Sequence, residues 1–317
     1  MSFSRRCISV YWLSRRGQFG PRFMRPDFKT LRGWIPLIVA PAVVMWQWPK
    51  VWPQWGLMWA IASSIYGGCK WLTFRRTPIA TASARCQMAY LLAWPGMDAA
   101  AFLNPSHSKS TERPRIAEWL SATIKLTIGV VLLRDVCGTF DDMPPFIVAW
   151  SGMIGLMLTL HFGLFQLLSC FWRANGIDAR PLMDQPIIST SLAELWGRRW
   201  NIAFRDLTHR FLFQPFTRRF GPRWGTWFGF AISGVIHDIV MSLPAGGGYG
   251  QPTLYFVMQA AGLMIERSRI GRRLGLGDGV RGWLFTMLVL IGPSRLLLHQ
   301  PFLERIIVPF VIAVRSL

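Results

Sequence analysis

Apolar stretches of close to 20 residues recur along this chain, and they constrain its fold more than any other feature. A helix needs ~20 apolar residues to cross a bilayer. The candidate spans are 33–48, 54–74, 116–133, 145–172, 224–243, 251–266, 281–298 and 302–314. Charged residues make up 16% of the chain, well below the ~25% of soluble domains. The sequence therefore predicts an all-α fold, a polytopic transmembrane helical bundle of about eight spans.

A further apolar piece, QMAYLLAWPGMDAAAFL at 87–103, is broken by Pro95-Gly96 and carries Asp98. If it crossed the membrane fully, the arginine-rich segment 173–223 would lie outside, whereas re-entry leaves the later basic loops on the cytoplasmic side. Broken backbone at membrane depth is tolerated where protein buries it. We therefore expect a re-entrant element here and both termini in the cytoplasm.

The net charge of +20 raises the question of a nucleic-acid partner. The basic residues fall between apolar segments and not on one compact domain, so retention on the cytoplasmic side explains them better and no nucleic-acid partner is expected. Part of the excess is suited to anionic lipid head groups or a phosphate-bearing substrate. Residues 1–32 are basic, with Asp27 as their single acid. We expect a cytoplasmic, lipid-facing arm at 1–32, with a transit peptide as the alternative, and one multi-span domain at 33–317.

Metal and disulfide chemistry has little support in the sequence. The five cysteines are scattered and never form a CxxC pair, and the chain contains no HExxH, P-loop or GxSxG pattern. Neither a zinc site nor a disulfide framework is indicated. We therefore expect no metal and no tightly bound cofactor.

The segment TSLAELWGRRWNIAFRDLTHRFLF at 190–213 has the pattern of an amphipathic helix. Ser191 and Glu194 form a capping box at its start, and Glu194–Arg198 and Asp206–Arg210 have the i,i+4 spacing of ion pairs. One helical face carries Trp196, Trp200, Phe204, Leu207 and Phe211, and another carries Glu194, Arg198, Asn201, Arg205 and Thr208 with His209 at its edge. Two interpretations stay open: a helix at the membrane surface, or a polar face that borders a reaction chamber and presents cations to a phosphate.

The stretch FAISGVIHDIVMSL at 230–243 places His237 and Asp238 inside an apolar run. An ionisable group at a bilayer centre costs roughly 2.5–3.5 kcal/mol, which points to a function. In helical geometry Ser233, Gly234 and His237 share a face that small residues direct toward other helices or a cavity. The His237 side chain then either hydrogen-bonds to a neighbouring helix or acts as an acid, base or ligand. Asp238 either orients it or pairs with an arginine.

The strings PIISTSLAELWGRRWN (186–201), LFQPF (212–216) and FAISGVIHDIV (230–240) resemble the wax synthase-like branch of the membrane-bound O-acyltransferase family. The piece YLLAWPGMDAAAFL (90–103) is similar to a segment of microbial members of that branch. The resemblance covers roughly 86–270, and SL-x-E-x-WGRRWN is its most specific part. Asp238 stands where a glutamate is common in the branch, and the spans before residue 86 match nothing specific.

The resemblance implies an enzyme that moves an acyl group from acyl-CoA, or another acyl thioester, to a hydroxyl of a lipid-like alcohol or small metabolite. It implies His237 as the catalytic residue and Asn201 as its partner. In the mechanism that we expect, His237 is the general base, Asn201 donates to the oxyanion or fixes the acceptor, and arginines meet the phosphates. The remaining site candidates are Asp238 as an orienting group, Arg198, Arg199 and Arg205 at the acyl carrier, and Trp196, Trp200, Ser233 and His209 in the substrate chamber.

Two other functions compete with the acyltransferase. A transporter would use the His237–Asp238 pair to relay protons, although transporters often carry internal repeats and no second copy of the 191–240 pattern occurs. A membrane scaffold needs only a helix rich in tryptophan and arginine. The acceptor, the acyl chain length and the oligomeric state are not readable from the sequence. We expect a multi-pass protein of a bacterial inner membrane.

Overall fold

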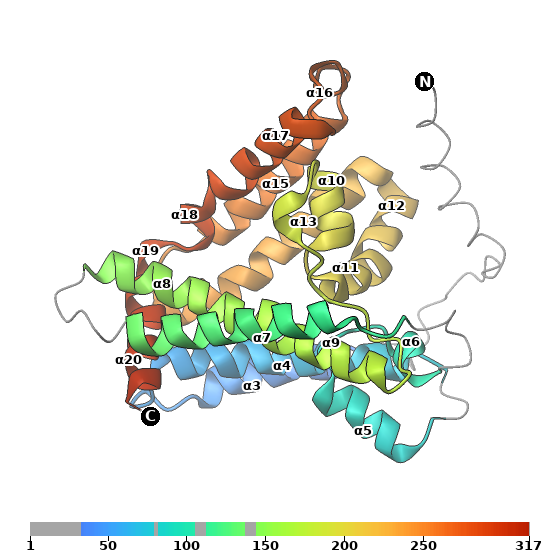
Figure 1. The fold of residues 1–317 in the computed structure, drawn as a ribbon. Coiled ribbons are helices and arrows are strands. Elements are labelled where there is room, and N and C mark those ends of the chain that lie inside the picture. The colour runs from blue at the N-terminus through green and yellow to red at the C-terminus, as the bar shows by residue number, and fades with distance from the viewer. Residues whose placement is uncertain (1–32, 79–81, 105–111, 137–143, 317) are drawn as a thin grey trace.

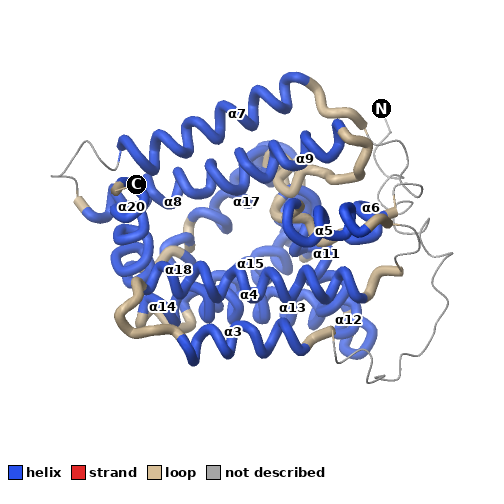
Figure 2. The backbone as a smooth tube through the Cα atoms, turned by 90° about the horizontal axis from the view of Figure 1, so that it is seen from below, coloured by secondary structure: helices blue, strands red, loops and turns tan. Residues whose placement is uncertain are grey.

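The computed structural model describes residues 33–78, 82–104, 112–136 and 144–316, and its regular elements are helices (Figure 1). Figure 2 shows the same helices from below, without a strand in the part of the chain that is described. The predicted all-α class is confirmed for these residues. The basic arm at 1–32 lies outside them and stays a prediction.

The eight apolar stretches all form helices, with boundaries close to the predicted ones. They are Ile35–Gln47 (α3), Gln54–Arg75 (α4), Ile116–Val131 (α7) with the π-helical turn Leu132–Val136 (η2), Pro145–Met157 (α8) continuing through Leu158–Leu164 (η3) to Phe165–Ala174 (α9), Pro222–His237 (α13) through Asp238–Ser242 (η7) to Leu243–Ala245 (α14), Gln251–Arg267 (α15), Gly279–Ile291 (α17) with Ser294–Leu297 (α18), and Gln300–Phe302 (α19) through Leu303–Ile307 (η8) to Val308–Arg315 (α20). Their apolar composition was therefore sufficient to locate them.

The number of spans differs from the prediction. Four helices have the length and apolar composition to cross a membrane: Ile116–Arg134, Pro145–Ala174, Pro222–Ala245 and Gly279–Leu297. With 13 residues α3 is short, and α15 has 17, whereas a perpendicular crossing needs ~20 at 1.5 Å per residue. The 22-residue α4 is long enough, but serines and Lys70 dilute its apolar character. The expected eight spans are not confirmed.

The helix break predicted in 87–103 is present. Ala84–Ala93 (α5) and Ala99–Leu103 (α6) are separated by residues 94–98, which contain Pro95 and Gly96. Lys70 Nζ donates to the carbonyl of Gly96 at 2.6 Å, and the Tyr66 hydroxyl donates to that of Trp94 at 3.1 Å. Side chains of α4 thus satisfy carbonyls that the break leaves outside a helix, as buried backbone requires. Re-entry into a membrane stays a prediction.

Glycines set the closest helix contacts. In Figure 2, α7 lies along the 145–174 helix, and a methyl group on Gly129 would lie 2.5 Å from Thr159 Oγ1. Between α13 and α15, a methyl on Gly234 would lie 2.6 Å from Thr253 Cα. Small residues let helix backbones approach in this way inside membranes. The second contact holds the C-terminal half of α13 against the N-terminal half of α15, where the candidate site lies.

Pro293 ends the hydrogen-bond ladder of α17. A proline has no N–H to donate to the carbonyl four residues earlier, and the Gln259 side chain replaces that donor on Val289 at 2.8 Å. The Tyr255 hydroxyl also donates, to Leu290, at 3.2 Å. Polar groups of α15 therefore cap the broken end of α17.

The remaining helices are Pro186–Ile188 (η4), Leu192–Glu194 (α10), Leu195–Arg199 (η5), Ile202–Thr208 (α11), His209–Phe213 (η6), Gln214–Phe220 (α12) and Arg269–Leu274 (α16).

Candidate functional site

Segment 190–213 is not the single helix that its pattern predicts. After α10 the chain winds into the π-helical turn η5, Trp200 is extended, and Asn201 adopts a left-handed conformation with φ 42° before α11 begins. A π-turn adds a residue to the turn, and a left-handed residue redirects the chain. Positions three or four apart on the two sides of this break therefore no longer share a face. The predicted continuous apolar and polar stripes are wrong across residue 200.

The predicted capping box is half formed. Ser191 Oγ accepts from the Glu194 amide at 3.0 Å, but the Glu194 carboxylate accepts from the Thr190 amide at 2.9 Å and from Arg199 Nε at 2.8 Å. The predicted Glu194–Arg198 pair is therefore wrong, because the π-turn brings residue i+5 into reach. Burial alone would raise the pKa of Glu194, but its bonds with Thr190 and Arg199 outweigh burial and lower it.

The three candidate arginines differ in what they contact. Arg199 also donates to the Asp184 carbonyl at 3.1 Å. Arg205 donates to the Gly197 carbonyl at 2.6 Å and pairs with Asp206, so the predicted Asp206–Arg210 pair is not formed. Arg198 is exposed and has no hydrogen bond or ion pair within the described ranges. Arg199 and Arg205 hold the backbone of η5 and its surroundings, and Arg198 is the cation directed to solvent.

Asn201 occupies a backbone conformation that few residues tolerate. It is one of two described non-glycine residues with positive φ, and asparagine is among the types that adopt it most readily. Its Oδ1 accepts from the Phe204 amide at 3.4 Å and caps α11. In the described part of the chain, Nδ2 makes no hydrogen bond, so the amide retains two donors for a ligand.

His237 ends α13 with its ring oriented by the backbone. Its Nδ1 lies 2.6 Å from the Ser233 carbonyl oxygen, one turn earlier, and its ring centroid lies 4.5 Å from that of Phe256. A carbonyl only accepts, so we assign the proton to Nδ1. Nε2 is then the unprotonated nitrogen, and it has no hydrogen bond to any described residue. A partly buried imidazole in this tautomer is poised to accept a proton.

Asp238 is directed away from that ring. Its carboxylate accepts from the amides of Gly250 at 2.8 Å and Thr253 at 3.0 Å, from the Thr253 hydroxyl, and from Ser242 Oγ at 2.9 Å. It makes no hydrogen bond to His237 among the described contacts. The predicted direct orienting contact is therefore not observed, because the start of α15 supplies stronger partners to the carboxylate. The orienting contact on the ring comes instead from the Ser233 carbonyl, while the Ser233 hydroxyl donates to Gly229.

Ring contacts join His237 to the segment that carries Asn201. Phe256 contacts both His237 and Trp196, with centroids 5.9 Å apart in the second pair. Trp196 in turn contacts Trp200 at 6.3 Å and Phe230 at 5.5 Å. Asn201 directly follows Trp200, but within the described residues no hydrogen bond connects it to His237. The structure thus brings Trp196 and Trp200 into one aromatic cluster with His237, through Phe230 and Phe256, which the sequence did not single out.

Two other titratable side chains bear on this region. His209 lies in η6, which packs against α13; its ring stacks on Phe213 at 5.2 Å, and burial lowers its pKa. Glu266 at the end of α15 is 6% exposed and accepts from the amides of Leu192 at 2.5 Å and Ala193 at 3.3 Å. Glu266 therefore caps the start of the 192–201 segment from another helix. An acid at the end of an apolar stretch was the one sequence signal for it.

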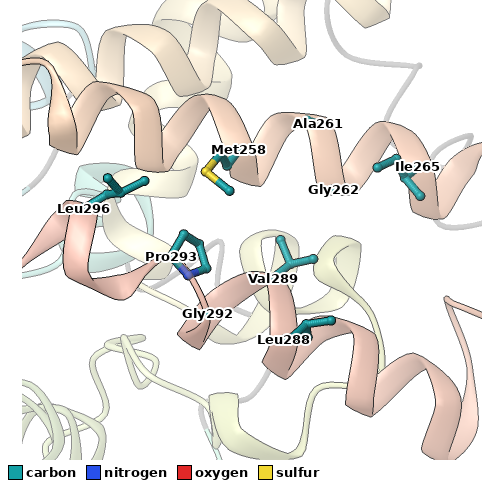
Figure 3. Close-up of a pocket in the computed structure, with 9 residues that line it drawn as sticks. All are labelled: Met258, Ala261, Gly262, Ile265, Leu288, Val289, Gly292, Pro293 and Leu296. Atoms are coloured by element: carbon teal, nitrogen blue, oxygen red, sulfur yellow. The ribbon is translucent and has the colours of Figure 1, made fainter.

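An apolar groove of about 520 Å³ lies between α15 and α17–α18 (Figure 3). Its lining residues are Met258, Ala261, Gly262, Ile265, Leu288, Val289, Gly292, Pro293 and Leu296. Met258 lies two residues beyond Phe256, which places it about 200° around the helix axis at 3.6 residues per turn. The groove is therefore on the opposite side of α15 from His237.

Within the described residues, no group of three histidine, cysteine or acidic side chains is placed to hold a metal ion.

Residues 179–258, which include Asn201 and His237, match the Membrane bound O-acyl transferase family. The chain is also similar to a probable long-chain-alcohol O-fatty-acyltransferase of Arabidopsis thaliana, with 24% identity over 60% of this chain and 63% of the relative. The acyl-CoA–sterol O-acyltransferase 1 of the same plant shares 28% identity over 43% of this chain and 39% of its own length. The Simmondsia chinensis long-chain-alcohol O-fatty-acyltransferase shares 28% over 50% and 49%.

The similarity covers only part of each of these relatives. The chain spans 63% of the first of these relatives and about half or less of the other two. All three are plant proteins, so the assignments to a microbial type and to a bacterial inner membrane stay predictions. The matched family and the four apolar helices agree on an integral membrane protein.

Proposed function

We propose that this chain is a membrane O-acyltransferase that forms an ester from acyl-CoA and a hydroxyl compound, with His237 as general base. The observation that carries the proposal is the bond from His237 Nδ1 to the Ser233 carbonyl inside an apolar helix. This bond leaves Nε2 as the proton acceptor, and the cost of placing a histidine there favours a chemical role. The family match over 179–258 supports the same reaction class.

The reaction follows from this tautomer. Nε2 takes the proton of the acceptor hydroxyl as its oxygen attacks the thioester carbonyl, so a carbon–oxygen bond forms. The tetrahedral intermediate collapses, the carbon–sulfur bond breaks, and the thiolate of CoA takes the proton back from Nε2. General-base assistance of this kind contributes about 10²–10⁴-fold. No covalent acyl-enzyme is needed.

Asn201 and Arg198 fill the two other roles. The Asn201 amide has donors available and lies beside Trp200 at the end of the aromatic cluster. It donates to the carbonyl oxygen as negative charge develops there, a contribution of roughly 10²–10³-fold. Arg198, exposed on η5, meets the phosphates of CoA, whereas Arg199 and Arg205 preserve the shape of that segment. The aromatic cluster around Trp196 contacts the apolar part of a substrate.

The named relatives indicate which acceptors to test first. Two of these relatives are named for long-chain alcohols and the third for sterols. An aromatic, apolar chamber suits both classes. The transporter alternative has no support from these relatives, and Asp238 forms no hydrogen bond with His237 that would make the pair a relay. The scaffold alternative leaves the cost of His237 unexplained.

The test is ester formation by membranes that contain the full chain, supplied with labelled acyl-CoA and, separately, a long-chain alcohol, a sterol and a diacylglycerol. We expect one class of labelled ester and saturable binding of acyl-CoA by the detergent-purified protein. A well-expressed, folded protein that forms no ester with any acceptor and binds no acyl-CoA refutes the proposal.

A further inference from the structure

A buried hydrogen-bond chain connects the C-terminal part of the protein to the residue after His237. His299 is 1% exposed and Ser242 is 0% exposed. His299 Nε2 lies 3.0 Å from Ser242 Oγ, and Ser242 Oγ lies 2.9 Å from Asp238 Oδ1. Such a chain is stabilising only when each member finds a partner of the right kind, because a half-satisfied buried polar group costs free energy.

The donors and acceptors of this chain can be assigned in one consistent direction. The Phe302 amide donates to His299 Nδ1 at 3.2 Å, so that nitrogen is the acceptor of the ring. His299 Nε2 therefore carries the proton and donates to Ser242. The single hydroxyl proton of Ser242 then points to Asp238, its nearer acceptor, and not to the Gly248 carbonyl at 3.3 Å. His299 is the first donor in a series that ends on the carboxylate.

Asp238 transmits this arrangement to α15. Its carboxylate binds the amides of Gly250 and Thr253 at the N-terminus of that helix, where a negative charge is favourable. Thr253 lies one turn before Phe256, whose ring packs on His237. Gly248, with φ +76°, is packed so closely on the His299 ring that a methyl group there would lie 2.3 Å from Nδ1. The 246–250 loop thus packs against His299, and the start of α15 is hydrogen-bonded to Asp238.

We propose that His299 is a positioning residue for the acyl-transfer site, acting through Ser242 and Asp238 on the packing of Phe256 against His237. This inference rests on the proposed function and extends it to a helix about 60 residues further along the chain. In a site that depends on geometry, a displacement of about 1 Å can cost ~10²-fold in rate. The network therefore affects turnover although none of its members contacts the reacting atoms.

Two variants of similar volume separate polarity from packing. His299→Phe fills the space without a donor, and His299→Gln keeps an N–H that reaches Ser242. We expect His299→Phe to lower kcat about 10- to 100-fold with little change in KM for acyl-CoA, and His299→Gln to recover most of the loss. His161→Phe is the matched control, because His161 also has a buried ring nitrogen but lies in η3, outside the network.

A double-mutant cycle tests the route of the effect. If His299 acts through Asp238, His299→Phe adds little to the loss in kcat already caused by Asp238→Asn. Additive losses would mean that the two residues act separately and would overturn the proposed route.

Hydrogen exchange provides a readout that needs no turnover. The amides of Gly250 and Thr253 should exchange faster in His299→Phe than in wild type or His299→Gln, while amides of α7 stay unchanged. Wild-type kcat and wild-type exchange in His299→Phe overturn the inference, and the proposed function stands if turnover still requires His237. If wild type forms no ester, the proposed function fails, and with it a positioning role in acyl transfer, whatever the exchange shows.

Discussion

The Nδ1 atom of His237 lies 2.6 Å from the carbonyl oxygen of Ser233, one turn earlier in the same helix. The ring of the proposed base is therefore oriented by its own backbone and not by the adjacent Asp238. A backbone carbonyl only accepts a hydrogen bond, so this contact favours the Nδ1–H tautomer of the neutral imidazole. The Asp238 carboxylate instead links the end of α13 to the start of α15 through hydrogen bonds.

Replacing His237 should lower turnover strongly with little effect on folding. His237→Ala removes the proton acceptor, and we expect ester formation to fall by at least about 10²-fold. The measurement is labelled ester per mole of folded protein in membranes, with His161→Ala as a control for loss of an intramembrane imidazole. Turnover at the wild-type rate in His237→Ala would contradict the role of His237 as base.

Substitutions at Asn201 can separate its backbone from its amide. Asn201→Asp keeps the oxygen that caps α11 and a residue type that tolerates positive φ, but it removes the Nδ2 donors. We expect kcat to fall about 10²-fold or more while the melting temperature in detergent changes little. Asn201→Gly serves as the conformational control, because glycine relaxes the backbone strain but also lacks the amide. Full activity in either variant excludes a catalytic amide.

The arginines of η5 should respond differently to alanine substitution. Arg198→Ala removes an exposed cation without internal bonds, so it should weaken acyl-CoA binding, and the effect should shrink at high salt because exposed charges are screened. Arg199→Ala breaks bonds to Glu194 and Asp184 and should lower the melting temperature. Binding isotherms at two salt concentrations and thermal unfolding measure the two effects. Equal binding by Arg198→Ala and wild type would remove Arg198 from the donor site.

The carboxylate of Glu266 should stabilise the fold, because it joins two segments that are distant in the sequence. Glu266→Ala leaves the buried amides of Leu192 and Ala193 without an acceptor, a loss of about 1–3 kcal/mol for an unsatisfied buried group. Glu266→Gln retains one acceptor and should lose less. Thermal unfolding in detergent ranks the variants, and wild-type stability of Glu266→Ala would show that water replaces the carboxylate.

Acid should weaken the contact between Glu194 and Arg199. Because the folded-state pKa of Glu194 is lowered below its ordinary value of 4.5, the contact stabilises the protein above about pH 4.5 and is lost as the pH falls through the lowered folded value. The wild-type protein should therefore exceed Glu194→Gln in stability near neutral pH, and the difference should shrink toward pH 3. Unfolding of both proteins at several pH values tests this. A difference that does not change with pH would contradict an ionic contribution.

Local signals in the sequence located the helices and the candidate base. Apolar stretches predicted the eight helical segments, Ser191 predicted the start of the 192–201 segment, and Pro95-Gly96 predicted the break between α5 and α6. Each of these effects acts within one or two turns of chain, which is the range that a residue pattern reports. The number of spans was not confirmed, because several helices are too short or too polar to cross a membrane by themselves.

Only the tertiary structure decided which groups contact one another. Arg199 and not Arg198 reaches Glu194 because the backbone winds into a π-turn, and Asn201 leaves the predicted face because the chain takes a left-handed turn there. The partners of Asp238 lie up to 15 residues away, and His299 reaches Ser242 across 57 residues. Such contacts depend on how helices pack, which a local pattern does not encode. The apolar pattern thus determined that His237 lies in an apolar helix, and packing determined its orientation and its neighbours.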